Sequence, residues 1–189
     1  FSLPALRLLG QLSASYIVAE GPDGLYLIDQ HAAHERILFE QINNQLSRQK
    51  IEIQGLLEPA TLEVSPRQDA ILKLHHRDLA EFGFSLESFG ERTYLVRAVP
   101  VWLDKKDWTG VLREIMDSPI GGGGDWRERI AISIACHSAV RAGQALSDEE
   151  MRNLIRELEK TSLSNTCPHG RPTMTHLSSG QLEKEFRRV

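Results

Sequence analysis

Residues 15–40 read SYIVAEGPDGLYLIDQHAAHERILFE and set the start of the fold. Two apolar runs, 15–20 and 25–29, flank the sequence GPDG (21–24), whose residues favour a tight turn, so they predict a β-hairpin. A helix is predicted directly afterwards, over about residues 31–45, because apolar side chains recur there at helical spacing. Antiparallel strands that lead straight into a helix favour an α+β fold.

Capping residues predict the other helices. Ser65, Ser147 and Ser178 are each followed three residues later by Gln or Glu, which is the capping-box pattern of a helix start. A further helix is expected to follow Asp125, and a short one is expected over residues 108–116. Additional strands are expected over residues 5–12, 84–86 and 94–99.

The order of these elements predicts two lobes within the α+β class. Both chain ends, residues 1–53 and 124–189, are expected to form one lobe. Residues 54–123 are expected to form a smaller α/β lobe inserted into it. Four consecutive glycines at 121–124 suit neither a helix nor a strand, so they predict a flexible joint.

The composition is that of a globular domain and excludes several classes of protein. The 189 residues are 41% hydrophobic and 25% charged, which excludes wholesale disorder, collagen-like repeats and a disulfide scaffold. The formal net charge of −4 lacks the basic character of a stand-alone nucleic-acid binder. Two cysteines are too few for a secreted framework, and no apolar run is long enough to span a membrane. We expect a cytoplasmic domain, and a fragment of a longer protein because residue 1 is Phe.

The predicted helix 31–45 carries the first residues that can ligate a metal ion. His31 and Glu35 are four residues apart and share one helix face, so an imidazole and a carboxylate can approach one ion. Asp29 lies at the junction of strand and helix and can point into the same space. Taken alone, this spacing is more often solvated or ion-paired.

Two cysteines and a second histidine extend the set. Cys167 and His169 belong to CPHGRP (167–172), where positions two apart in an extended segment face the same side and can chelate together. Arg171 can bind phosphate or carboxylate through its guanidinium. The alternative is a rigid surface turn with a free thiol. Cys136 lies in a predicted buried helix, where a lone cysteine is usually a small apolar residue.

Pooled, these residues have the chemistry of a metal site. Two thiolates, two imidazoles and a carboxylate suit zinc, and four of the five would fill a tetrahedral shell. The fifth, with Asp29, leaves room for a harder ion, Mn²⁺ or Mg²⁺, and paired ions are common in phosphodiester hydrolysis. The candidate ligands are His31, Glu35, Cys136, Cys167 and His169.

Four motifs in order resemble the C-terminal domain of the MutL family of DNA mismatch-repair proteins, in its endonuclease-bearing branch. The family pattern D-Q-H-A-x-x-E-x-x-x-x-E matches residues 29–40, and an Ala-Cys-Arg/Lys segment matches 135–137. C-P-H-G-R-P matches 167–172, and a final F-x-R segment matches 186–188. His137 departs from the pattern by replacing the usual Arg or Lys, which removes a fixed positive charge near the site or adds an extra ligand.

The resemblance implies a function. It implies a homodimer with a dimerisation lobe built from both chain ends and an external, regulatory lobe. It also implies a metal-dependent endonuclease that nicks duplex DNA without sequence specificity. Asp29 is then essential for cleavage, Glu35 bridges or ligates metal, zinc is structural or regulatory, and manganese supports nicking. Glu40 lies five positions after Glu35 and points away from that face, so it suits a supporting contact. Supporting roles are expected for Glu40, His137, Arg171, Arg187 and Arg188.

The resemblance also implies partners. An absent N-terminal domain would bind ATP, and a mismatch-recognition protein of the MutS type and the replication sliding clamp would direct the domain to DNA at the nucleoid. Residues 54–59 (QGLLEP) resemble the Q-x-x-L/I-x-P motif that docks on the clamp, with Gln54, Leu57 and Pro59 as contacts. The alternative for this segment is an ordinary strand between lobes.

The amino-acid sequence is also compatible with two other functions. A non-catalytic dimerisation and clamp-docking module with a structural zinc would keep the fold and lose the nuclease. A Cys-His hydrolase would use Cys167 as its nucleophile. The hydrolase is disfavoured because a stiff Cys-Pro-His segment holds its side chains parallel, which suits chelation better than proton transfer.

Overall fold

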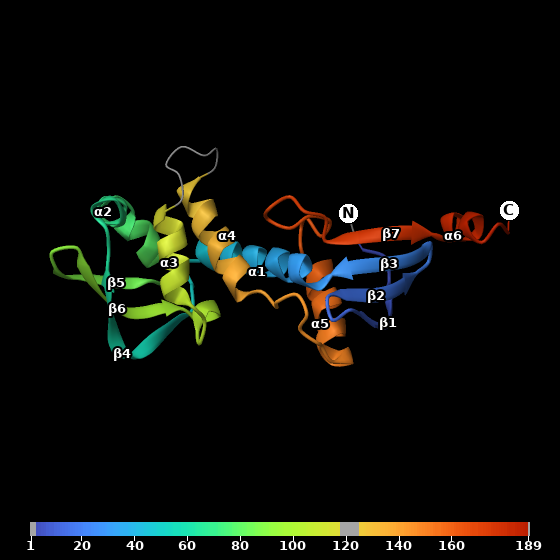
Figure 1. Cartoon of the computed structure of the whole chain (residues 1–189), viewed down its shortest axis with the longest axis horizontal. Coiled ribbons are helices and arrows are strands. Elements are labelled where there is room, and N and C mark those ends of the chain that lie inside the picture. The colour runs from blue at the N-terminus through green and yellow to red at the C-terminus, as the bar shows by residue number, and fades with distance from the viewer. Residues whose placement is uncertain (1–2, 118–124, 189) are drawn as a thin grey trace. The chain divides into compact units, whose positions relative to one another are not determined.

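A computed structural model of the chain describes residues 3–117 and 125–188. These residues form two antiparallel β-sheets and six α-helices, so the predicted α+β class is confirmed (Figure 1). The chain divides into two compact units, one made of Phe1–Glu40 and Ala139–Val189 and the other of Gln41–Ser138. The assignment of dimerisation and external roles to lobes bounded at residues 53 and 124 stays a prediction.

The first unit contains a four-stranded sheet with the order β1-β2-β3-β7. The predicted hairpin is confirmed, since Ile17 pairs with Ile28 and Ala19 pairs with Tyr26. Directly paired residues share a face, and all four are buried on the core side of the sheet. The strands are β1 (Arg7–Leu12), β2 (Tyr16–Gly21), β3 (Gly24–Asp29) and β7 (Met174–Ser178).

Helices supply the rest of this unit's core. α1 (Gln30–Ser47) begins directly after β3, and its residues beyond Glu40 belong to the second unit. α5 (Asp148–Glu159) contributes an apolar stripe at helical spacing, and α6 (Ser179–Glu185) follows β7. The buried core residues are Leu3, Ile17, Ile28, Ala33, Ile37, Met151, Leu154, Ile155 and Leu158.

The second unit contains a three-stranded sheet with the order β4-β6-β5. Its strands are β4 (Ile53–Glu63), β5 (Ser85–Gly90) and β6 (Thr93–Pro100). Its helices are α2 (Pro66–Glu81), the 3₁₀ turn η1 (Val101–Leu103), α3 (Trp108–Asp117) and α4 (Trp126–Ser138). Fully buried side chains include Leu62, Leu72, Phe82, Phe84, Leu103 and Leu112.

Three predicted helix starts are confirmed by their hydrogen bonds. At Ser65, Ser147 and Ser178 the side chain accepts from the third main-chain N–H of the helix, and the Gln or Glu side chain returns to the cap residue. The four glycines at 121–124, expected to form a flexible joint, lie outside the described residues. No helix in the described ranges combines the length and apolar character that a bilayer-spanning segment needs.

Candidate metal centre

The Asp29 carboxylate caps the N-terminus of α1. Its Oδ1 accepts from the main-chain N–H of His31 at 2.9 Å and of Ala32 at 3.0 Å. The main-chain N–H of Asp29 donates to the Thr173 carbonyl oxygen at 2.9 Å, which ties the strand end to the chain entering β7. Capping fixes where this carboxylate lies, because it satisfies helix N–H groups that have no partner within the helix.

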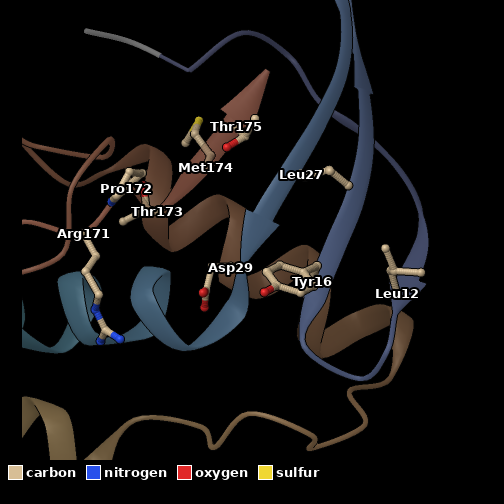
Figure 2. Close-up of a pocket in the computed structure, with 9 residues that line it drawn as sticks. All are labelled: Leu12, Tyr16, Leu27, Asp29, Arg171, Pro172, Thr173, Met174 and Thr175. Atoms are coloured by element: carbon tan, nitrogen blue, oxygen red, sulfur yellow. The ribbon is translucent and has the colours of Figure 1, made fainter. Parts of the chain in front are cut away.

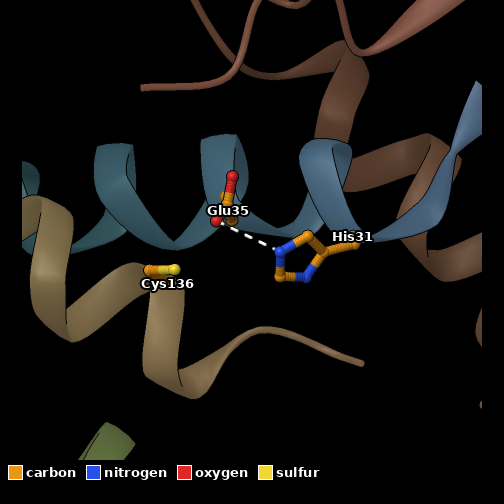
Figure 3. A group of neighbouring side chains, drawn as sticks. All are labelled: His31, Glu35 and Cys136. Atoms are coloured by element: carbon orange, nitrogen blue, oxygen red, sulfur yellow. Dashed lines mark ion pairs between the residues drawn. The ribbon is translucent and has the colours of Figure 1, made fainter. Parts of the chain in front are cut away.

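Glu35 is the buried centre of the site. Its side chain is 0% exposed, and Oε1 lies 3.3 Å from His31 Nε2 on the same helix (Figure 3). Oε2 lies 3.4 Å from His169 Nδ1 and 3.0 Å from Arg171 Nη2. Burying a carboxylate is costly without charged or hydrogen-bonding partners, so this grouping of cationic and imidazole nitrogens is what makes the position tolerable.

The segment that carries Cys167 and His169 is a tight turn. The Cys167 carbonyl accepts from the N–H of Gly170 at 2.9 Å, and its N–H donates to the Arg171 carbonyl at 2.8 Å. The expectation of an extended segment was wrong, because Pro at the second position and Gly at the fourth favour a turn. Gly170 has φ +78°, a conformation that suits glycine.

The turn nevertheless brings the predicted ligands together. Ligand atoms of Glu35, Cys167 and His169 lie within 4.8 Å of one another, and all three residues belong to the first unit. A carboxylate, a thiol and an imidazole are a donor set that zinc accepts, and His31 adds a second imidazole beside Glu35. These residues fit the implied ion. Cys136, also drawn in Figure 3, is carried by α4 of the second unit, and its part in ligation stays a prediction.

Arg171 links this cluster to a neighbouring cavity. The Cys167 side chain and, after it, the Glu35 carboxylate raise the pKa of the Arg171 guanidinium, which keeps it cationic. The cavity has a volume of about 480 Å³, and Asp29 and Arg171 both lie on its wall (Figure 2). The Arg171 guanidinium itself points toward α1, where Nη2 lies 3.0 Å from Glu35 Oε2. The full lining is Leu12, Tyr16, Leu27, Asp29, Arg171, Pro172, Thr173, Met174 and Thr175.

Two further residues of α1 hold the chain just before the turn. Glu40 accepts from the Ser162 N–H at 2.8 and 3.0 Å, from the Ser162 hydroxyl at 2.9 Å and from the Leu163 N–H at 3.3 Å. Arg36, which is 6% exposed, donates from Nε to the Thr166 carbonyl oxygen at 2.5 Å. Glu40 therefore contacts the loop rather than the ligand cluster.

Replacing Glu40 with alanine is expected to loosen this loop. The main-chain N–H groups of Ser162 and Leu163 would lose the acceptor that orders them, and an ordinary hydrogen bond contributes about 0.5–1.5 kcal/mol. Hydrogen exchange of these two amides, followed by NMR, should accelerate, whereas the exposed Glu159→Ala control should leave them unchanged. Equal exchange in Glu40→Ala and in the parent chain would show that Glu40 does not hold the loop.

Sequence reasoning did not assign roles to Gln30, His34 and Arg36. Gln30 is 0% exposed and donates to the carbonyls of Ala14 at 2.8 Å and Gln144 at 2.9 Å, which joins the β1–β2 turn to the chain after α4. The two contacts span 16 and 114 residues, so local spacing gives no signal for either of them. The one signal in the sequence was that these polar residues stand between apolar neighbours on a helix that was expected to be partly buried.

The remaining predicted residues lie elsewhere. His137 Nε2 lies 2.6 Å from Glu114 Oε2 within the second unit, so an acidic partner on α3 faces it. Arg187 and Arg188 follow α6. Ser178 pairs with Gly24, so α6 starts beside the first residue of β3. Asp29 is the last residue of β3 and lies at the other end of the strand. The structure therefore places the two terminal arginines with Phe186, over whose ring Arg188 lies at 5.8 Å, and not with the Glu35 cluster.

Known proteins are similar to this chain in sequence. Residues 9–146 match the family described as the MutL C terminal dimerisation domain. The DNA mismatch repair protein MutL of Geobacter sp. (strain M21) is 40% identical over 190 residues, which cover 98% of this chain and 29% of that protein. The proteins of the same name from Exiguobacterium sp. (strain ATCC BAA-1283 / AT1b) and Methanoculleus marisnigri (strain ATCC 35101 / DSM 1498 / JR1) are each 41% identical over 191 residues. Those alignments cover 99% and 98% of this chain and 32% of each relative. This chain belongs to the MutL C-terminal dimerisation domain family.

Proposed function

We propose that this chain is the metal-dependent endonuclease domain of a MutL-type mismatch-repair protein, which nicks duplex DNA without sequence specificity. The observation that carries the proposal is the buried Glu35 carboxylate, surrounded by His31, Cys167, His169 and Arg171. A glutamate is almost never fully buried unless its charge is paired, and the partners of Glu35 are groups that can ligate a metal or carry a positive charge. The relatives are named as mismatch repair proteins, and the chain spans only 29% to 32% of their length.

The residues divide the chemistry between them. Glu35, Cys167, His169 and His31 would hold zinc, and Asp29 with Glu35 would offer oxygen ligands to Mn²⁺ or Mg²⁺. When bound, such ions lower the pKa of water and offset the negative charge that develops during phosphodiester hydrolysis. Arg171 would bind a phosphate oxygen through the guanidinium N–H groups that Glu35 does not occupy.

The principal alternative is a non-catalytic dimerisation module with a structural zinc. Nicking of supercoiled plasmid in the presence of Mn²⁺ and the sliding clamp separates the two functions. We expect relaxed circles that a chelator abolishes. Bound zinc without nicking under any of these conditions would favour the non-catalytic module. A Cys-His hydrolase has less support, because Cys167 is only 1% exposed and its sulfur is shielded from a substrate.

For dimerisation we propose the outer face of the four-stranded sheet. Val18 pairs with Gly10 and Leu27, and Tyr16 pairs with Leu12 and Asp29, so these residues share the face opposite the core. Leu12 is 52% exposed and Tyr16 is 43% exposed, which leaves an apolar sheet surface open to solvent. A second copy is the occupant favoured by the family description, and it would close one wall of the cavity beside Asp29, because Leu12, Tyr16 and Leu27 also line that cavity.

Replacing Val18 with glutamate is expected to make the chain monomeric. A carboxylate at the centre of an apolar interface would be desolvated without a partner, at a cost of several kcal/mol. Sedimentation velocity should report half the mass of the parent. Leu74, 72% exposed on α2 of the second unit, provides the matched Leu74→Glu control. A dimeric Val18→Glu chain would exclude this face.

The sliding clamp is proposed as a partner of residues 54–59. β4 is an edge strand of its sheet. Gly55 pairs with Ala98 and Ala60 pairs with Val96. Residues 56–59 are therefore four residues of β4 opposite the single residue Arg97 of β6, and they form a bulge. Gln54, Leu57 and Pro59 are exposed, and Leu57 is 102% exposed. An extended apolar segment held away from its sheet is available to a partner's pocket.

Leu57→Ala is expected to weaken clamp binding by about 10-fold or more, because each 1.4 kcal/mol lost from an anchor residue is tenfold in affinity. Surface plasmon resonance against the immobilised clamp measures it. Leu74 is exposed as well, and the Leu74→Ala control should have no effect. If both variants bind as the parent does, the segment is an ordinary strand.

The other partners belong to the whole protein. ATP binding by an N-terminal domain, a MutS-type protein that recognises the mismatch, and duplex DNA are proposed on the basis of family membership. The net charge of −4 supports a domain that receives DNA from its partners rather than one that collects DNA itself.

A further inference from the structure

Two histidines of α1 bind both main-chain polar groups of Val140. The N–H of Val140 donates to His34 Nδ1 at 3.0 Å. The carbonyl oxygen of Val140 accepts from His31 Nδ1 at 2.8 Å. Val140 lies just after α4, in a stretch without regular secondary structure, and belongs with both histidines to the first unit. The two side chains therefore fix one residue of an otherwise irregular segment.

These contacts assign opposite tautomers to the two rings. A carbonyl oxygen only accepts, so His31 carries a proton on Nδ1, and in the neutral ring its lone pair is then on Nε2. The Nε2 atom is the one that lies 3.3 Å from Glu35 Oε1. A main-chain N–H only donates, so His34 has its lone pair on Nδ1 and its proton on Nε2.

We propose that His34 is a positioning residue for His31. By holding the N–H of Val140, His34 places the Val140 carbonyl where it selects the His31 tautomer that presents a free Nε2 toward Glu35. Histidines that ligate metals usually donate their other ring N–H to a carbonyl or carboxylate, which orients the ring and raises its basicity. The inference rests on the proposed metal site and assigns a role to a residue whose position is variable in the D-Q-H-A-x-x-E pattern.

Two substitutions of His34 isolate the hydrogen bond. In His34→Asn the side-chain amide oxygen takes nearly the place of Nδ1 and can still accept from Val140. In His34→Leu a side chain of comparable bulk lacks any acceptor. The Asn variant is thus the rescue, and the Leu variant tests the loss of the bond while the half-buried position stays filled.

The first measurement is made without metal. Long-range ¹H–¹⁵N NMR of the imidazole, at a pH where histidine is neutral, distinguishes the Nδ1–H form from the Nε2–H form. We expect His31 in the Nδ1–H form in the parent and in His34→Asn, and a shift toward the Nε2–H form in His34→Leu. The Val140 amide should exchange slowly in the first two and faster in the third. An unchanged His31 tautomer in a folded His34→Leu chain would overturn the proposal.

The second measurement is the dissociation constant for Zn²⁺, obtained by competition with a chromophoric chelator. Outer contacts of this kind are worth about 10- to 100-fold in metal affinity, so His34→Leu should bind that much more weakly and His34→Asn close to the parent. Equal affinity in all three would overturn the positioning role. If the parent itself bound no zinc, the proposed metal site would fail, while the tautomer measurement would still decide the role of His34.

Discussion

Replacing Asp29 with asparagine is expected to reduce nicking of supercoiled plasmid by about 10²- to 10⁴-fold, the range that a positioned catalytic side chain contributes. Asn keeps one oxygen that can accept from His31 and Ala32, and it caps helices as well as Asp does. It loses the negative charge that a divalent ion or its bound water requires. Activity should therefore fall while the thermal unfolding midpoint stays near that of the parent.

An alanine at the same position provides the matched comparison. Asp29→Ala removes the cap as well as the charge, so it should lower the free energy of unfolding by about 1 kcal/mol in addition to abolishing nicking. Denaturant unfolding and the plasmid assay are measured on both variants. Nicking by Asp29→Asn at the parent rate would remove Asp29 from the catalytic site and leave it a capping residue.

Replacing Glu35 with glutamine is expected to have the largest effect on metal binding. Glu35 is the residue that faces His31, His169 and Arg171 together, so the loss of its charge affects every partner. We expect zinc affinity to fall by more than about 100-fold, because a residue that only hydrogen-bonds to a metal ligand already contributes up to about that factor. The metal-free chain should be no less stable than the parent, because an amide costs less to bury than a carboxylate.

The stabilisation that zinc gives on binding separates the loss of zinc affinity from any change in the stability of the metal-free chain. A ligand present at a hundred times its dissociation constant stabilises the native state by about 2.7 kcal/mol. The parent chain and an exposed control, Glu183→Gln, should show this gain on adding zinc, and Glu35→Gln should not. A gain of equal size in Glu35→Gln would place the ion elsewhere in the protein.

Much of the fold could be predicted because its signals are local. The capping boxes at Ser65, Ser147 and Ser178 mark helix starts through contacts three residues apart, and the hairpin at 15–29 has turn residues between two apolar runs. Strand β7 was not predicted, and a strand at β4 was considered only as the alternative for residues 54–59. β4 contains Gly55 and Pro59 and is mostly exposed, so its pairing with β6 rather than its own pattern makes it a strand.

In the site, too, local contacts could be predicted and long-range contacts could not. The helical spacing of His31 and Glu35 predicted a shared face, and their atoms indeed lie 3.3 Å apart. The CPHGRP segment was expected to be extended and is a turn. Pro168 and Gly170 favour the backbone angles of a turn, whether or not a metal ion is bound. The contact of His34 with Val140 joins residues 106 positions apart, and no local rule anticipates such a pair.

The central claim is that Glu35, Cys167 and His169 ligate one ion, and Co²⁺ substitution tests it most directly. A thiolate bound to Co²⁺ produces a charge-transfer absorption band that carboxylates and imidazoles do not. We predict this band on titration of the parent chain, and its loss or strong reduction in Cys167→Ser. Cys136→Ser, measured in parallel, shows whether the second thiol contributes. No band in the parent chain, or an unchanged band in Cys167→Ser, would contradict the account.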